Sequence, residues 1–113
     1  MEDLLGYSRM GASWEGFVIE NIIANLAEGS RASFYRSAAG AEIDLVLELP
    51  GHRKSWAVEI KRGRSPKLER GFHHAREDID PERCLVVCGT DEPFSMGDGI
   101  EAMGLPGALR LLK

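Results

Sequence analysis

The sequence contains no apolar run that approaches the roughly 20 residues needed to cross a bilayer. Its first residues, Met1 to Leu5, also lack the basic and apolar regions of a signal peptide. These two absences argue against membrane insertion and secretion. We therefore expect a cytoplasmic protein without a membrane partner.

Cysteine is scarce, since only Cys84 and Cys88 occur in the chain. They lie four positions apart in a strand-like run, so at ~3.3 Å per residue their Cα atoms are roughly 13 Å apart, too far for a disulfide. Two lone thiols also make a poor metal site. We expect both cysteines to be buried and structural.

The composition is that of a single folded domain. The chain has 113 residues, 43% of them hydrophobic and 28% charged, which is ordinary for a globular protein and argues against disorder. We expect one domain over residues 1–113, with no internal repeat or low-complexity tract.

Charge is unevenly distributed along the chain. The net charge of −4 argues against a protein whose whole surface binds nucleic acid. The segment from His52 to Arg76, however, contains eight Arg and Lys residues and only two Glu residues. That segment could follow a phosphate backbone. The alternative is a solvated helix face and a flexible loop, which charge alone favours.

Periodicity and turn residues predict the order α-β-β-β-α-β, in a mixed α/β (α+β) fold. The first three strands are expected to form an antiparallel meander, and the fourth to run parallel to the third after a helical crossover. Residues 1–12 are expected to form a short lead-in segment. A short edge strand is expected near residues 99–102, and a closing helical turn over residues 106–112. The expected elements are a helix over 14–27, strands over 31–36, 41–48 and 55–62, a helix over 66–78, and a strand over 83–89.

Three ionisable residues interrupt the apolar strands 41–48 and 55–62, namely Asp44, Glu59 and Lys61. Because side chains alternate along a strand, Glu59 and Lys61 share a face. Ionised groups removed from water cost several kcal/mol each unless they are paired. A divalent cation between the two carboxylates, with the lysine beside it, would remove that cost. The alternative is a buried ion-pair network without a metal.

The first helix carries a further candidate. Glu15 falls near the centre of an apolar stripe that includes Val18, Ile19 and Ile22, so it is expected to point toward the sheet. The alternative is that Glu15 lies in the first helical turn, where the helix dipole stabilises a carboxylate that still reaches water.

The order of these residues resembles the PD-(D/E)xK nuclease-like superfamily, with Glu15 on the first helix, Asp44 on the second strand and Glu59-Ile60-Lys61 on the third. Ile43 stands where the superfamily's name has proline, a position without a catalytic role. More narrowly, the chain resembles the uncharacterised C-terminal domain of bacterial and archaeal AAA-type ATPases. The segments that carry this likeness are Gly11-Ala12-Ser13-Trp14-Glu15-Gly16-Phe17-Val18, Phe34-Tyr35-Arg36, Glu42-Ile43-Asp44 and Val58-Glu59-Ile60-Lys61.

The resemblance implies a restriction-endonuclease-like core, a mixed sheet flanked by helices. It implies that Asp44, Glu59 and the carbonyl of Ile60 hold Mg²⁺ or Mn²⁺, that Lys61 orients water or stabilises the transition state, and that Glu15 completes the shell. The expected reaction is hydrolysis of nucleic-acid phosphodiesters. The expected nucleic-acid contacts are Arg36, Arg62, Arg64 and Lys67.

The sequence contains no Gly-x-x-x-x-Gly-Lys-Ser/Thr phosphate loop. If the narrower resemblance holds, the ATPase module is absent from this chain, which would be the C-terminal part of a longer protein and would not hydrolyse ATP. Nucleic acid, the ATPase module and a second copy of the chain are the candidate partners. Two functions remain open: a Mg²⁺-dependent nuclease, and a non-catalytic module that binds nucleic acid or protein for an attached ATPase.

Overall fold

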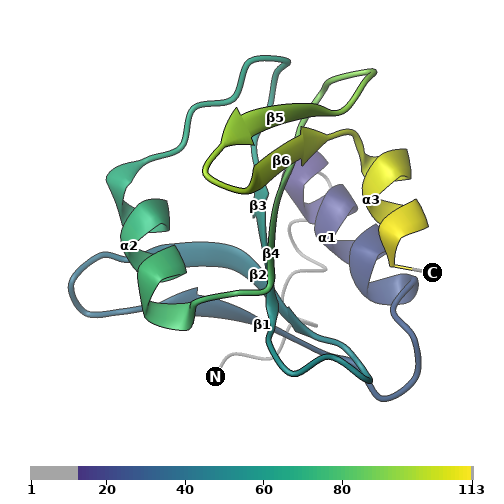
Figure 1. Ribbon diagram of the computed structural model, residues 1–113. Coiled ribbons are helices and arrows are strands. Elements are labelled where there is room, and N and C mark those ends of the chain that lie inside the picture. Colours follow the sequence, from purple (N-terminus) through teal and green to yellow (C-terminus); the bar gives the residue numbers. More distant parts are fainter. Residues whose placement is uncertain (1–12, 113) are drawn as a thin grey trace.

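The computed structural model describes residues 13–112, in which three helices cover a six-stranded mixed sheet (Figure 1). The expected lead-in over residues 1–12 lies outside the described part of the chain. The elements are α1 (Trp14–Ala24), β1 (Arg31–Arg36), β2 (Glu42–Glu48), β3 (Trp56–Ile60), α2 (Arg70–Ile79), β4 (Arg83–Val87), β5 (Phe94–Gly97), β6 (Ile100–Met103) and α3 (Leu105–Leu111).

The sheet has the strand order β1-β2-β3-β4-β6-β5. The pairs β1–β2 and β2–β3 are antiparallel, and β4 runs parallel to β3 after α2, so the predicted meander and helical crossover are confirmed. The carboxyl ends of β3 and β4 therefore lie at the same edge of the sheet.

The prediction for the end of the sheet was incomplete. The strand expected at the edge near residues 99–102 is β6, which lies inside the sheet, parallel to β4, and the edge is formed by β5. A tight turn joins β5 to β6, with positive φ at Gly97, Asp98 and Gly99. The glycines that permit this turn also obscure the hydrophobic alternation of two short strands.

The helix α1 begins at a side-chain cap and buries one face. Ser13 Oγ accepts a hydrogen bond from the Gly16 N–H at 3.1 Å. The helix ends at Ala24, three residues earlier than predicted. The Asn25 side chain donates to the Asn21 carbonyl at 2.8 Å, and such local bonds compete with continuation of a helix.

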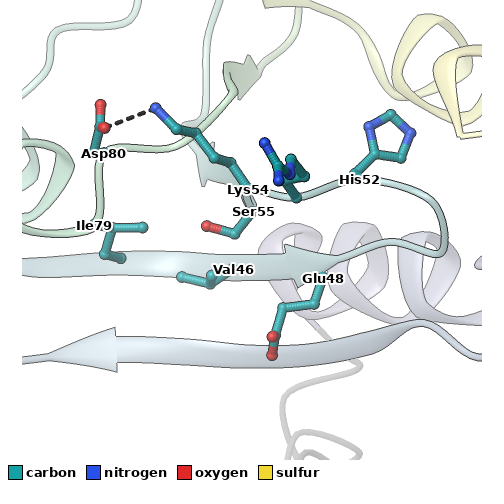
Figure 2. A pocket seen from close by; sticks show the side chains of 8 residues that line it. Val46, Glu48, His52, Lys54, Ser55, Ile79 and Asp80 are labelled. Carbon is teal, nitrogen blue, oxygen red and sulfur yellow. Dashed lines mark hydrogen bonds and ion pairs between the residues drawn. The ribbon is translucent and has the colours of Figure 1, made fainter.

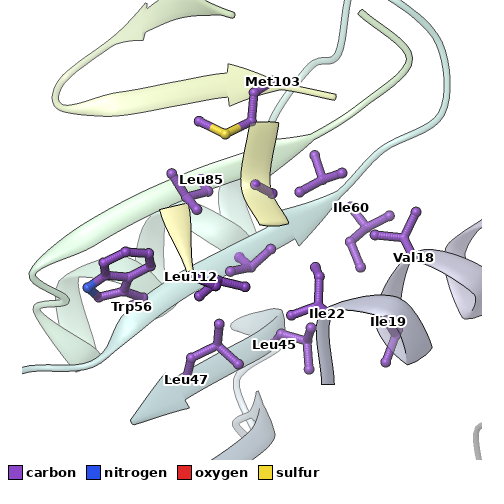
Figure 3. Packing of buried hydrophobic residues seen from close by; sticks show 13 residues of the cluster. Val18, Ile19, Ile22, Leu45, Leu47, Trp56, Ile60, Leu85, Met103 and Leu112 are labelled. Atoms are coloured by element: carbon purple, nitrogen blue, oxygen red, sulfur yellow. The ribbon is translucent and has the colours of Figure 1, made fainter. Parts of the chain in front are cut away.

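Two apolar layers hold the helices against the sheet. On one face, α1 and α3 pack over β2, β3 and β4, as Figure 3 shows for Ile22, Leu45 and Trp56. On the other face, α2 inserts Phe72 and Ala75. Because β4 is buried on both faces, as predicted, Cys84 and Cys88 are buried free thiols.

The start of α2 differs from the prediction. The sequence predicted a helix from Pro66, but residues 66–69 have no regular structure and α2 begins at Arg70. A 2.7 Å hydrogen bond from the Gly89 N–H to the Gly63 carbonyl connects the loop before the helix to the segment that follows β4. This later start places Glu69 at the N-cap of α2.

None of the helices between residues 13 and 112 has the length and apolar character required to span a bilayer.

The N-terminal turn of α2 fits against the β1–β2 turn only because residue 71 is glycine. A Cβ at Gly71 would lie 2.7 Å from the carbonyl oxygen of Gly40. We therefore expect Gly71→Ala to lower the free energy of unfolding by about 1–3 kcal/mol, as overpacking does elsewhere. Urea denaturation of both proteins measures the difference.

Gly107→Ala in α3 is the control, because a Cβ there makes an ordinary 3.5 Å contact with Met103. Alanine in a helix interior stabilises by up to about 1 kcal/mol over glycine, so this variant is expected to match or exceed the wild type. Equal destabilisation by both substitutions would contradict the close approach at Gly71.

Candidate functional site

A cleft of about 520 Å³ brings most of the predicted site residues together. Ile19 from α1 and Phe72 from α2 both line it, so the cleft lies between elements that cover opposite faces of the sheet. The predicted residues that line the cleft are Glu15, Arg36, Asp44, Glu59, Ile60, Lys61 and Arg62. The tertiary structure therefore collects residues that are separated by up to 47 positions in the chain.

An irregularity in β2 lies at Asp44 and Leu45. Ser33 and Tyr35 of β1, two positions apart, pair with Val46 and Ile43 of β2, which are three positions apart. One extra residue in a strand is a β-bulge, which bends the strand and changes the direction of its side chains. The bulge therefore includes the residue predicted to hold the metal.

The two acidic side chains replace backbone pairing between β2 and β3. The paired residues of these strands end at Leu45 and Val58. Beyond this point the Asp44 N–H donates to Glu59 Oε1 at 3.1 Å, and the Ile60 N–H donates to Asp44 Oδ2 at 2.8 Å. Each carboxylate thus satisfies a backbone N–H of the opposite strand that would otherwise lack a partner.

Burial makes this carboxylate pair unfavourable in its doubly ionised form. Glu59 is only 7% exposed. Its desolvation, followed by the negative charge of Asp44, raises the pKa of Glu59 to about 8. Burial also raises the pKa of Asp44, against the hydrogen bond from Ile60. At neutral pH the pair therefore retains a proton, which a bound cation could replace.

Lys61 lies beside this pair and has a second acidic neighbour. Its Nζ is 3.9 Å from Glu59 Oε2 and 3.5 Å from Glu69 Oε1. Sequence reasoning did not select Glu69, because the helix was expected to begin at Pro66. The available signal was an acidic residue close to the start of that helix, where the helix dipole favours negative charge.

Glu15 and Arg62, predicted for different roles, contact each other. Arg62 Nε lies 3.1 Å from Glu15 Oε1, and the Glu15 side chain is 45% exposed. Glu15 lies in the first turn of α1 with a water-accessible side chain, as the alternative expected, and it also lines the cleft.

The other predicted nucleic-acid contacts are divided. Arg36 lines the cleft and pairs with Glu42 at 3.4 Å. Arg64 lies outside the lining and pairs with Asp91 at 2.7 Å. Lys67 is exposed and also outside the lining. The structure therefore does not bring Arg64 and Lys67 to the predicted metal site.

The basic segment is also divided in space. A second hollow of about 380 Å³ lies at the other end of β3, and its lining includes His52 and Lys54 (Figure 2). There Lys54 Nζ lies 2.8 Å from Asp80 Oδ2, and His52 Nδ1 lies 2.8 Å from Glu82 Oε2. Arg53 and Lys54 thus line this hollow and Lys61 and Arg62 line the cleft, and both linings also contain acidic side chains. The other four basic residues of the segment line neither.

The donor set near Asp44 fits Mg²⁺ better than a soft metal. Among residues 13–112, no group of three or more His, Cys, Asp and Glu side chains is arranged to hold a metal ion. Asp44 and Glu59 do lie together, with Ile60 lining the same cleft. Mg²⁺ takes one or two protein carboxylates and keeps several waters, so two carboxylates and a backbone oxygen are sufficient protein ligands.

Comparisons with known proteins identify a family without an assigned function. A model described as a domain of unknown function, DUF4143, matches residues 10–107. The uncharacterized proteins Rv2008c of Mycobacterium tuberculosis and Mb2031c of Mycobacterium bovis are each 35% identical over 95 residues, which cover 84% of this chain and 21% of theirs. The chain thus spans about a fifth of the length of these curated relatives. No solved structure matches significantly.

The raised pKa of Glu59 predicts how stability changes with pH. The folded state keeps a proton on Glu59 up to pH of about 8, whereas the unfolded chain loses it near 4.5. The Glu59 contribution to stability is therefore fully present below pH 4.5 and is lost as pH rises toward and through 8. In EDTA, the free energy of unfolding of the wild type is expected to fall by on the order of a few kcal/mol across this pH interval, and Glu59→Gln is expected to remove that fall.

Urea denaturation at pH 5, 6.5 and 8.5 measures this difference. Glutamine keeps the oxygen that accepts from the Asp44 N–H, so the hydrogen bond can survive the substitution. Glu20→Gln on the exposed face of α1 is the control and is expected to follow the wild type. Parallel pH profiles for wild type and Glu59→Gln would show that Glu59 has an ordinary pKa.

Proposed function

The chain belongs to the DUF4143 family, and we propose that its cleft is a Mg²⁺-dependent site for hydrolysing nucleic-acid phosphodiesters, of the PD-(D/E)xK nuclease type. The observation that carries the proposal is that the Asp44 N–H donates to Glu59 Oε1 and the Ile60 N–H donates to Asp44 Oδ2, with Lys61 beside Glu59. The two carboxylates are thereby held near each other. A metal site requires this proximity, which the spacing of the residues in the sequence does not provide by itself.

Asp44, Glu59 and the backbone oxygen of Ile60 would hold the cation. When bound, Mg²⁺ or Mn²⁺ lowers the pKa of a coordinated water and neutralises charge on phosphoryl oxygens. The protein supplies a nearly buried glutamate with a raised pKa, whose ionised form the cation would stabilise. Exchange of a proton for a cation is the usual linkage at such sites.

Lys61 would act on the substrate. Its side chain is 25% exposed and its Nζ lies 3.9 Å from Glu59 Oε2, so the ammonium group lies beside the proposed metal and can still reach the cleft. A fixed positive charge there stabilises the negative charge that develops on phosphoryl oxygens in the transition state. Glu15 would contribute by positioning Arg62, since Arg62 Nε lies 3.1 Å from Glu15 Oε1.

A non-catalytic function for the same cleft is the second candidate. It is favoured by the ion pair between Glu15 and Arg62, which gives Glu15 a partner other than a metal. In this alternative the domain binds nucleic acid or protein on behalf of an ATPase module elsewhere in a longer polypeptide. The two candidates differ in whether the bound phosphodiester is cleaved.

Metal binding is the first test. Calorimetric titration with Mn²⁺ at pH 8 is expected to show one bound ion, and Asp44→Asn and Glu59→Gln are each expected to abolish the signal. Affinity for wild type is expected to fall by up to about tenfold per pH unit below 8, because the ion must displace the Glu59 proton. Glu20→Gln, outside the cleft, is expected to leave the titration unchanged.

Cleavage is the second test. Labelled single-stranded, duplex and branched nucleic acids are incubated with the protein and Mg²⁺ or Mn²⁺. Cleavage is expected for wild type and none for Asp44→Ala, while Lys61→Met is expected to retain Mn²⁺ binding and cleave about 100-fold more slowly. Cleavage by Asp44→Ala at the wild-type rate, or by neither protein, would exclude the nuclease function. Binding without cleavage would favour the second candidate.

A further inference from the structure

Every basic side chain in the described lining of the cleft contacts a carboxylate. These contacts are the pairs Arg36 Nε–Glu42 Oε2 (3.4 Å), Lys61 Nζ–Glu69 Oε1 (3.5 Å) and Arg62 Nε–Glu15 Oε1 (3.1 Å). Each positive group that would meet a nucleic-acid backbone therefore already has a carboxylate neighbour in the free protein. A phosphate that bound at the same nitrogen atom would replace that carboxylate.

Two of these carboxylates are exposed enough to rotate away from their basic partners. The side chains of Glu42 and Glu69 are 60% and 83% exposed. Glu42 is the first residue of β2, and Glu69 is the N-cap of α2 and makes no side-chain capping bond. Exposed ion pairs contribute only about 0–1 kcal/mol, so rotating either carboxylate into water costs little.

The buried carboxylate behaves differently. Glu59 is 9% exposed in its side chain and accepts the Asp44 N–H, so it cannot move away from Lys61 without leaving a backbone group unpaired. Lys61 thus has one fixed acidic neighbour and one displaceable neighbour. Only Glu69 can give up its place to a phosphate while the pair of Asp44 and Glu59 stays intact.

We propose that Glu42 and Glu69 substitute for phosphate groups in the free cleft by holding Arg36 and Lys61, and that a bound nucleic-acid strand displaces both carboxylates. This inference rests on the proposed function, because it takes the ligand to be a nucleic acid. A small anion that displaces only one of the two carboxylates binds weakly, since it leaves the other ion pair in place. A strand whose phosphates displace both Glu42 and Glu69 gains binding free energy at Arg36 and at Lys61. The two carboxylates therefore favour a polymer over a single phosphate.

Fluorescence anisotropy with a fluorescein-labelled 20-nucleotide oligonucleotide, single-stranded and duplex, tests the proposal in EDTA. Glu42→Gln and Glu69→Gln are each expected to tighten binding about 3-fold to 10-fold and to steepen the plot of log Kd against log salt concentration by about one. Glu20→Gln changes the net charge by the same amount outside the cleft and is expected to shift Kd by less than about 1.5-fold.

The outcomes separate this inference from the proposed function. Binding by wild type, with Glu42→Gln and Glu69→Gln indistinguishable from Glu20→Gln, would overturn the inference and leave the proposed function standing. Failure of wild type and every variant to bind either oligonucleotide in EDTA would overturn the inference. The proposed function, which requires a metal ion, is tested separately by the Mn²⁺ titration and the cleavage assay. Tightening at the cleft positions alone supports both the inference and the proposed function.

A second measurement needs no nucleic acid. The rate of acylation of Lys61 by a small amine-reactive ester, followed by mass spectrometry, is compared with that of Lys54, which pairs with Asp80 at 2.8 Å and serves as the internal reference. Glu69→Gln is expected to speed acylation of Lys61 at least twofold relative to Lys54. An unchanged ratio would show that Glu69 does not hold Lys61 in solution.

Discussion

The site depends on two hydrogen bonds between β2 and β3, one from the Asp44 N–H to the Glu59 carboxylate and one from the Ile60 N–H to the Asp44 carboxylate. β2 and β3 pair through their backbones up to Leu45 and Val58, and beyond that point the two carboxylates accept the free N–H groups of the opposite strand. The strands can therefore separate without leaving buried donors unpaired. The same bonds fix both carboxylates, one of them almost fully buried, beside each other.

This arrangement is costly unless something compensates the second negative charge. A proton does so in the absence of a cation, which is the physical meaning of the raised pKa of Glu59. Lys61 compensates only in part, because its Nζ lies 3.9 Å away and is shared with Glu69. A hard divalent cation would neutralise more charge than either, and this preference links the geometry of the strands to the proposed chemistry.

The charges around the cleft form two layers with different mobility. The inner layer, Asp44 and Glu59, is held by backbone hydrogen bonds and can change only its proton or its cation. The outer layer, Glu42 and Glu69, is exposed and held by weak ion pairs. A net charge of −4 is compatible with nucleic-acid binding if phosphates displace Glu42 and Glu69, as we propose.

The sequence determined the parts of this protein that depend on local pattern. Alternation and turn residues predicted the meander, the crossover and the doubly buried β4, and the interruption of apolar runs identified Asp44, Glu59 and Lys61. The tertiary structure alone decided the contacts between distant residues. It set the bulge at Asp44 and Leu45, the late start of α2 that brings Glu69 to Lys61, and the pairing of Glu15 with Arg62. These depend on strand register and on the approach of Gly71 to Gly40, which no local spacing encodes.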